Sequence, residues 1–196
     1  MTRPSRRFPS RQAGTAATEF ALVSLVFFTF VFGIIEVSRI LFVFNTLQEV
    51  TRRAAEAAVN VYPRDTDTIT QLKQAAVFRS SSGELILGAP VSDNHVRLDY
   101  LAYDLSVIPK GSWPSCAAQN RQICMANPHS SSCIRFVQVR ICNPNQADDC
   151  QRVTSSMLVP LVSLNVPLPK AETIAAVETL GYHAGTPPCS PLPPGT

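Results

Sequence analysis

Charge is scarce in this chain of 196 residues. Only 16% of the residues are charged, against roughly 25% in soluble globular proteins, and the mean hydropathy is slightly positive at +0.09. Part of the chain is therefore expected to lie outside water. A hydrophobic content of 45% excludes disorder of the whole chain. The length suits one folded domain with an anchor or a tail, and it is too short for two large domains.

The common signatures of catalysis and cofactor binding are also missing. The chain has eight glycines and contains no G-x-S-x-G, no G-x-x-x-x-G-K-[ST] and no G-x-G-x-x-G motif. His95, His129 and His183 are scattered, and the closest cysteines leave seven residues between them, whereas zinc sites favour two to four. The sequence therefore predicts a protein that is not an enzyme and that holds no metal or other cofactor.

The excess of positive charge is confined to the N-terminus. Arg3, Arg6, Arg7 and Arg11 lie within the first fourteen residues, so the remainder of the chain carries a formal net charge of −1. A nucleic-acid-binding domain needs clustered positive charge on its folded surface to neutralise phosphates. We therefore expect no nucleic-acid partner.

A long apolar run follows this basic arm. Residues 20–35 contain no charge, and the apolar character continues to residue 44 except at Glu36, Ser38 and Arg39. As a helix, residues 20–44 would rise about 37 Å, enough to cross a hydrocarbon core with some tilt. The arginines before the run predict a cytoplasmic N-terminus and export of the chain after about residue 45. Glu36 and Arg39 share one helical face and can form an ion pair near the outer interface.

The residues around this run resemble the TadE-like family of the bacterial tight-adherence (Tad) pilus system. The resemblance rests on residues 14–20 (GTAATEF), on residues 33–39 (GIIEVSR), and on Gln48 and the alanines that follow it. It implies a pseudopilin, or minor pilin-like subunit, cut by a prepilin peptidase between Gly14 and Thr15. Glu19 would then be the fifth residue of the mature chain, followed by Phe20, where pilins keep a glutamate that pairs with the N-terminal amine of a neighbouring subunit. The implied partners are the peptidase, other Tad pilins and pseudopilins, and assembly-platform proteins.

Two other interpretations of the apolar run stay open to different degrees. A cleaved secretory signal would end at a small-residue site, and this run ends instead in Glu36-Val37-Ser38-Arg39. An ordinary single-pass anchor, in which Glu19 reaches the cytoplasmic headgroups, fits the composition as well. In that case a cysteine-rich exported domain that binds a ligand or a surface partner, unrelated to pili, is the alternative function.

The exported part is predicted to be α+β. Apolar residues recur every three or four positions in residues 45–61, which predicts an amphipathic stem that ends at Pro63, and residues 67–78 predict a second, shorter helix. Residues 85–87, 96–101 and 137–141 alternate with period two and predict strands of an antiparallel sheet packed against the stem. Residues 158–166 and 173–180 are further strand candidates, the latter equally compatible with a helix.

These patterns divide the chain into four parts. We expect a basic cytoplasmic leader in residues 1–14, a membrane-spanning and stem helix in residues 15–61, the exported domain in residues 62–184 and a proline-rich tail in residues 185–196. The expected location is the bacterial inner membrane, crossed once, with the C-terminal domain on the periplasmic side.

The six cysteines all follow the apolar run, at Cys116, Cys124, Cys133, Cys142, Cys150 and Cys189. An even number of cysteines in an exported, oxidising compartment predicts disulfides. Fifteen pairings are possible for six cysteines, and the trial pairs are Cys142 with Cys150 and Cys116 with Cys133.

Overall fold

A computed structural model describes residues 13–145, 150–155, 157, 165–185 and 189. The contacts within the chain define two compact units, residues 1–40 and residues 41–196. The expected proline-rich tail, most of the basic leader and most of the candidate strand at residues 158–166 lie outside the described residues.

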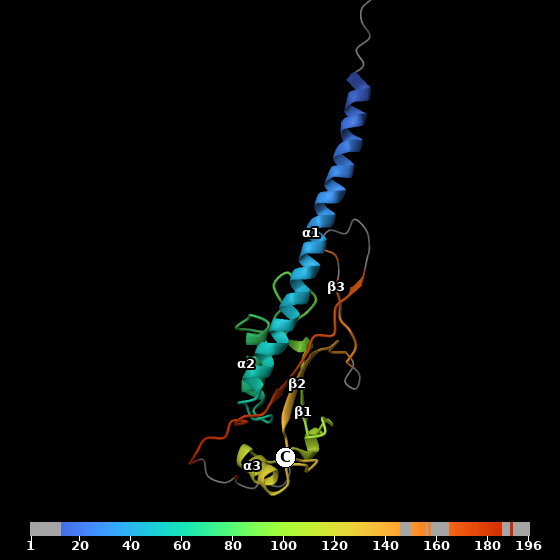
Figure 1. Cartoon of the computed structure of the whole chain (residues 1–196). Helices are drawn as coiled ribbons and strands as arrows, with labels where there is room; N and C mark the ends of the chain where they lie inside the picture. Colours follow the sequence, from blue (N-terminus) through green and yellow to red (C-terminus); the bar gives the residue numbers. More distant parts are fainter. Residues whose placement is uncertain (1–12, 146–149, 156, 158–164, 186–188, 190–196) are drawn as a thin grey trace, which may run out of the picture. The chain divides into compact units, whose positions relative to one another are not determined.

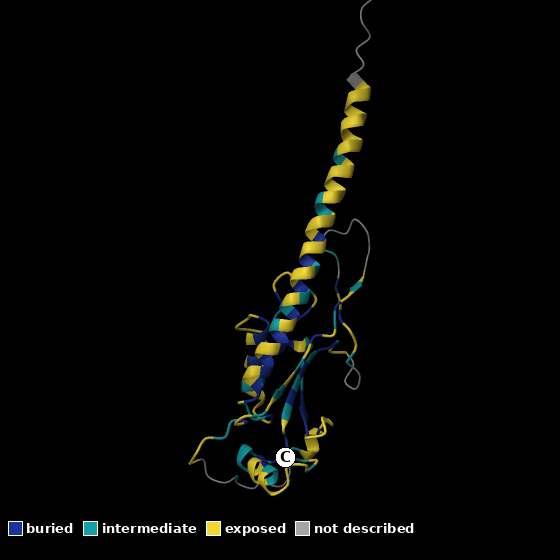
Figure 2. Ribbon diagram, viewed as in Figure 1, coloured by how far each residue is buried: buried dark blue, intermediate teal, exposed yellow. Residues whose placement is uncertain are grey.

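One helix, α1, runs through Ala13–Ala58 and belongs to both units. The sequence has no proline between residues 13 and 62, and Pro63 prevents further continuation. Within the first unit, α1 is the element that the structure describes, and its large apolar side chains are exposed (Figure 2). By length and composition, this helix can cross a membrane.

The second unit is an α+β domain, which confirms the predicted fold class (Figure 1). After α1 come α2 (Thr66–Ala76), the short helix η1 (Asp93–His95), β1 (Val96–Leu101), the short helix η2 (Lys110–Ser112), α3 (Ala117–Ala126), β2 (Phe136–Ile141), β3 (Thr154–Ser155), β4 (Val166–Pro167) and β5 (Glu172–Ala176). The main sheet has the order β1-β2-β5 and is antiparallel, with Leu98 opposite Val139 and Val139 opposite Thr173. Strands β3 and β4 form a separate two-stranded sheet.

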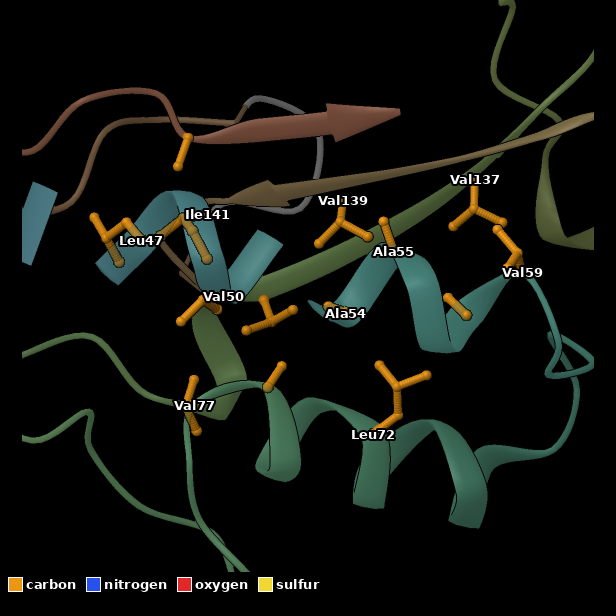
Figure 3. Close-up of a cluster of buried hydrophobic side chains, with 14 of the residues drawn as sticks. Leu47, Val50, Ala54, Ala55, Val59, Leu72, Val77, Val137, Val139 and Ile141 are labelled. Carbon is orange, nitrogen blue, oxygen red and sulfur yellow. The ribbon is translucent and has the colours of Figure 1, made fainter. Parts of the chain in front are cut away.

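The core of this unit is built around the C-terminal part of α1. Leu47, Val50 and Ala54 are fully buried on the helix, and the predicted amphipathic stem is confirmed as a packing face of its own domain. Figure 3 shows the β2 side chains Val137 and Val139 on one side of α1 and Leu72 of α2 on the other. The small side chains of the alanines at positions 54, 55 and 58 allow the sheet and α2 to approach the helix closely.

Hydrogen bonds fix the start of α2 and the segment that follows α1. Helix α2 begins after Asp65, whose carboxylate accepts a hydrogen bond from the backbone N–H of Thr68 at 3.1 Å and so caps the helix. At the end of α1, the Tyr62 hydroxyl donates to the carbonyl of Pro114, and Arg64 Nη2 donates to the carbonyl of Trp113 at 3.1 Å. The chain that leaves the stem is thereby tied to the segment before α3.

The structure corrects two of the predicted elements. Residues 85–87 form no strand; Glu84 makes an isolated bridge to Ser92, and Leu87 adopts a positive φ of 58° that ends any extended run. Residues 117–126, which none of the predicted elements covers, form helix α3. The ambiguous run at residues 173–180 is resolved as strand β5, which ends at Ala176.

Three disulfides join all six cysteines. The trial pair Cys142–Cys150 is confirmed, whereas the trial pair Cys116–Cys133 is wrong. Cys124 pairs with Cys133 across the loop that follows α3, and Cys116 pairs with Cys189, 73 positions later. The long-range pair Cys116–Cys189 is one that spacing alone could not reveal.

Candidate functional site

The first part of α1 presents the residues to which the sequence assigns an assembly role. Gly14 and Thr15 lie in the first turn of the helix and Glu19 in the second, and all three are exposed. Thr15 and Glu19 are four positions apart, so they occupy the same helical face. Their arrangement places the predicted scissile bond and the predicted assembly carboxylate about one turn apart.

Apolar side chains dominate the surface that continues from Glu19. Phe20 is 75% exposed. Large apolar residues on every face of the helix up to Val37 are also exposed, to a smaller fraction. A helix that is apolar all round and exposed in an isolated chain requires lipid or other helices around it. The surface therefore suits both a bilayer and a bundle of similar helices.

Three hydroxyl side chains on this segment bond to their own helix. The hydroxyls of Thr18, Thr29 and Ser38 donate to backbone carbonyls of the preceding turn, each at 2.8 Å. Hydroxyls satisfied in this way need no water, which lowers the cost of placing them in an apolar environment. The segment is thus compatible with a membrane along its length beyond Glu19.

The ion pair expected between Glu36 and Arg39 is present. Arg39 donates from Nη2 to Glu36 Oε1 at 2.7 Å and from Nε to the same oxygen at 3.0 Å, and both residues are buried. A carboxylate and a guanidinium that are buried as a hydrogen-bonded pair avoid the large cost of burying either charge alone. Whether this pair lies at a membrane interface stays a prediction.

Beyond the helix, the described residues contain no group that resembles a metal centre. All six cysteines are in disulfides, and no cluster of three or more His, Cys, Asp or Glu side chains occurs in the described part of the chain. His95 accepts a hydrogen bond at Nδ1 from the backbone N–H of Ser92 at 3.0 Å, and His129 packs edge-on against Tyr103. Both of these histidines therefore make contacts within the fold.

The charged residues of the sheet also pair with one another. Asp99 on β1 accepts from Arg97 Nε at 3.2 Å and from Arg140 Nη2 at 2.6 Å, which joins β1 to β2. Near this cluster, burial lowers the pKa of Lys73, and the charge of Lys110 lowers it further. The cluster has the features of a cross-strand ion-pair network that stabilises the sheet.

Sequence reasoning did not single out one surface feature, a groove of about 510 Å³ beside the stem. Its lining includes Phe42 and Glu49 of α1, together with Phe78, Leu85 and Ile86 from the segment after α2. Leu85 and Ile86 were interpreted as strand residues, and only the fold brings them against α1. No periodicity in the sequence could have predicted this juxtaposition.

Comparison with known proteins supports the assignment of the helix. A family model described as TadE-like protein matches residues 14–56, less than a quarter of the chain. No curated protein and no solved structure matches the sequence. The matched region begins at the predicted cleavage site and ends in the part of α1 that enters the domain core. Residues 14–56, within helix α1, are therefore similar to the TadE-like family.

Proposed function

We propose that the chain is a pseudopilin or minor pilin-like component of Tad-type pilus assembly that acts without catalysis. The observation that carries this proposal is the match to the TadE-like family over the same segment of α1 whose apolar side chains are exposed. Assembly would proceed through this helix, which would leave the bilayer to pack among the helices of other pilins and pseudopilins. The domain from Leu41 onward would be carried along as the exported head.

The proposed maturation step is cleavage between Gly14 and Thr15 by a prepilin peptidase. Residues 1–14 would be the leader and residues 15–61 the assembly helix and stem, followed by the exported domain in residues 62–184 and the tail in residues 185–196. Cleavage would create a new α-amine on Thr15, and Glu19 would pair with such an amine on a neighbouring subunit. An ionised carboxylate in an apolar surrounding is costly without a partner, and this pairing would supply one.

The proposed location is the bacterial inner membrane, with the N-terminus in the cytoplasm. The arginines of the leader support this orientation, and the three disulfides support an oxidising compartment for the domain. Glu36 and Arg39 would lie near the outer interface, where their ion pair would let the helix carry two charges. The expected partners are the peptidase, other Tad pilins and pseudopilins, and assembly-platform proteins.

Replacement of Glu19 tests the assembly role. In a host with its own Tad system, we expect Glu19→Ala to leave membrane insertion intact and to reduce the recovery of the chain with other pilus subunits at least about tenfold, as expected for an ion pair worth about 1.4 kcal/mol or more. Glu56→Ala is the matched control, because Glu56 lies on the same helix in an exposed pair with Arg52. Normal association of the Glu19 variant would contradict the proposal.

N-terminal sequencing of the protein from membranes of that host tests the cleavage. A new terminus at Thr15 is expected, and an intact Met1 would favour a plain anchor.

To test for a pilus-independent binding domain, an unrelated anchor should replace residues 1–40 and leave the chain from Leu41 unchanged, because α1 is part of the domain core from Val43 onward. A pilus subunit loses its function in this exchange, and a simple binding module keeps it.

A further inference from the structure

The groove beside the stem is apolar on the side where the chain enters the domain. Phe42, Phe78 and Ile86 line it and are 48%, 41% and 60% exposed, and Leu87, next to Ile86, is 55% exposed. Exposed aromatic and aliphatic side chains that gather at one place on a small domain mark a contact surface. We call Phe42, Ile86 and Leu87 the apolar collar.

The segment that carries Ile86 and Leu87 is held firmly by its backbone. Leu85 N–H donates to the carbonyl of Val91 at 2.7 Å, and Gly88 N–H donates to the carbonyl of Leu85 at 2.9 Å. Leu85 itself is buried, and a Cβ at Gly88 would come within 2.6 Å of its Cδ2 atom. Burial of Leu85 thus anchors a tight turn that presents the next two apolar side chains outward.

Leu87 adopts a positive φ of 58°, which is unusual for a large side chain. This conformation costs of the order of 1 kcal/mol relative to an ordinary backbone region. A turn in this position could carry glycine or asparagine without that cost. The presence of leucine here agrees with a use for its exposed side chain.

The position of the collar along α1 indicates what covers it. Phe42 is within residues 20–44, the run long enough to span a bilayer, and Glu49, at the other end of the groove, lies seven residues later, or about 10 Å along the helix. At that far end Arg53 pairs with Glu49 at 2.6 Å and lies over the Phe78 ring at 4.5 Å from its centroid. The groove therefore changes from apolar to charged in the direction that leads away from the span.

We infer that the apolar collar inserts into the outer interface of the lipid bilayer, beside the point where α1 leaves it. Apolar and aromatic side chains followed by arginine are the pattern of an interfacial anchor. The collar would fix the height and tilt of the domain above the membrane before assembly. The inference rests on the proposed membrane span, and the occupant it names is lipid and not a second copy of the chain, because Phe42 of the collar and its exposed neighbour Leu41 belong to the apolar run that extends to residue 44.

The test places tryptophan probes in the full-length chain, reconstituted at one copy per lipid nanodisc. Ile86→Trp reports on the collar, Met125→Trp on the exposed face of α3, where Met125 is 75% exposed, and Phe28→Trp on the span. Discs contain phosphatidylcholine with or without bromine on the acyl chains near the headgroup, and the signal of Trp113 is subtracted with the unmodified chain. We expect the bromine to quench Ile86→Trp at least about twofold, as for a side chain 5–10 Å deep in the headgroup boundary, and to leave Met125→Trp unchanged.

The other outcomes separate the inference from the proposed function. Quenching of Phe28→Trp without quenching of Ile86→Trp would overturn the collar and retain the span. Absence of quenching at both positions would overturn the span and the collar together. A blue shift of Ile86→Trp that occurs only at two copies per disc, with no effect of bromine, would assign the collar to contact between copies and overturn the lipid assignment.

Discussion

The stem helix should be indispensable to the domain that follows it. If residues 41–60 are part of the core, a fragment of residues 41–196 will fold without the membrane span, and a fragment of residues 61–196 will not. Both fragments can be exported behind an unrelated cleavable signal, so that the disulfides form in an oxidising compartment. The perturbation removes only the helix and leaves every strand and cysteine in place.

The magnitude follows from the buried side chains of the stem. Val43, Leu47, Val50 and Val59 are each no more than 5% exposed in the domain core. Full burial of a valine or leucine side chain contributes about 1.5–3 kcal/mol, so these four contribute about 6–12 kcal/mol. That sum is comparable with the whole free energy of unfolding of a typical domain, about 5–15 kcal/mol. The fragment without them should have no folded state at 25 °C.

Circular dichroism during heating measures the difference. A cooperative unfolding transition is expected for residues 41–196, and none for residues 61–196. In the longer fragment, Leu47→Ala should reduce the free energy of unfolding by about 3–5 kcal/mol, while Arg52→Ala, on the exposed face of the same helix, should change it by less than about 0.5 kcal/mol. A cooperative transition of residues 61–196 at the same temperature as residues 41–196 would refute the reasoning.

Three further changes test the domain. Asn120→Ala should cost about 2–3 kcal/mol in urea unfolding, because the Asn120 side chain accepts from the backbone N–H of Ile134 at 2.9 Å and donates to its carbonyl at 3.2 Å; a loss below about 0.5 kcal/mol would contradict this role. Burial lowers the pKa of His95 below its usual value of 6.5. Because the unfolded state then binds the proton more strongly, the free energy of unfolding should fall as the pH drops below about 6.5. His95→Gln should flatten this pH dependence in thermal unfolding. Removal of the Cys116–Cys189 bridge by a double serine variant should cost about 4 kcal/mol, since the bridge closes a loop of 73 positions; an unchanged urea midpoint would show that the bridge adds nothing.

The elements that sequence reasoning predicted well share one property, which is a periodic apolar face. Strand β1 has the predicted bounds of residues 96–101, and β2 differs from its prediction by one residue. In β2 every second side chain is buried, as the alternation predicts, whereas in β1 Asp99 is buried as well. Helix α2, at Thr66–Ala76, lies close to its predicted range of residues 67–78. These signals are carried by residues a few positions apart in the chain.

Helix α3 escaped prediction because it has no apolar face. Its buried residue is Asn120, a polar side chain that the fold uses to hold the backbone of Ile134. The strand predicted at residues 85–87 was wrong for a different reason. Its apolar residues suit a strand, but they form a turn in which Leu85 is buried. In both cases the conformation depends on contacts with another part of the chain.

The sequence by itself determined the apolar run and its resemblance to the TadE-like family, because these depend on composition and on residues within one helix. Cleavage before Thr15 and the assembly role of Glu19 stay predictions that this resemblance implies. Only the tertiary structure decided which cysteines pair, that α1 enters the domain core from Val43 onward, and that Phe42 and Ile86 lie on one groove. The physical reason is the range of the interactions. Helix formation and membrane partition are set by local sequence, whereas disulfides, core packing and surface grooves depend on residues that only the folded chain brings together.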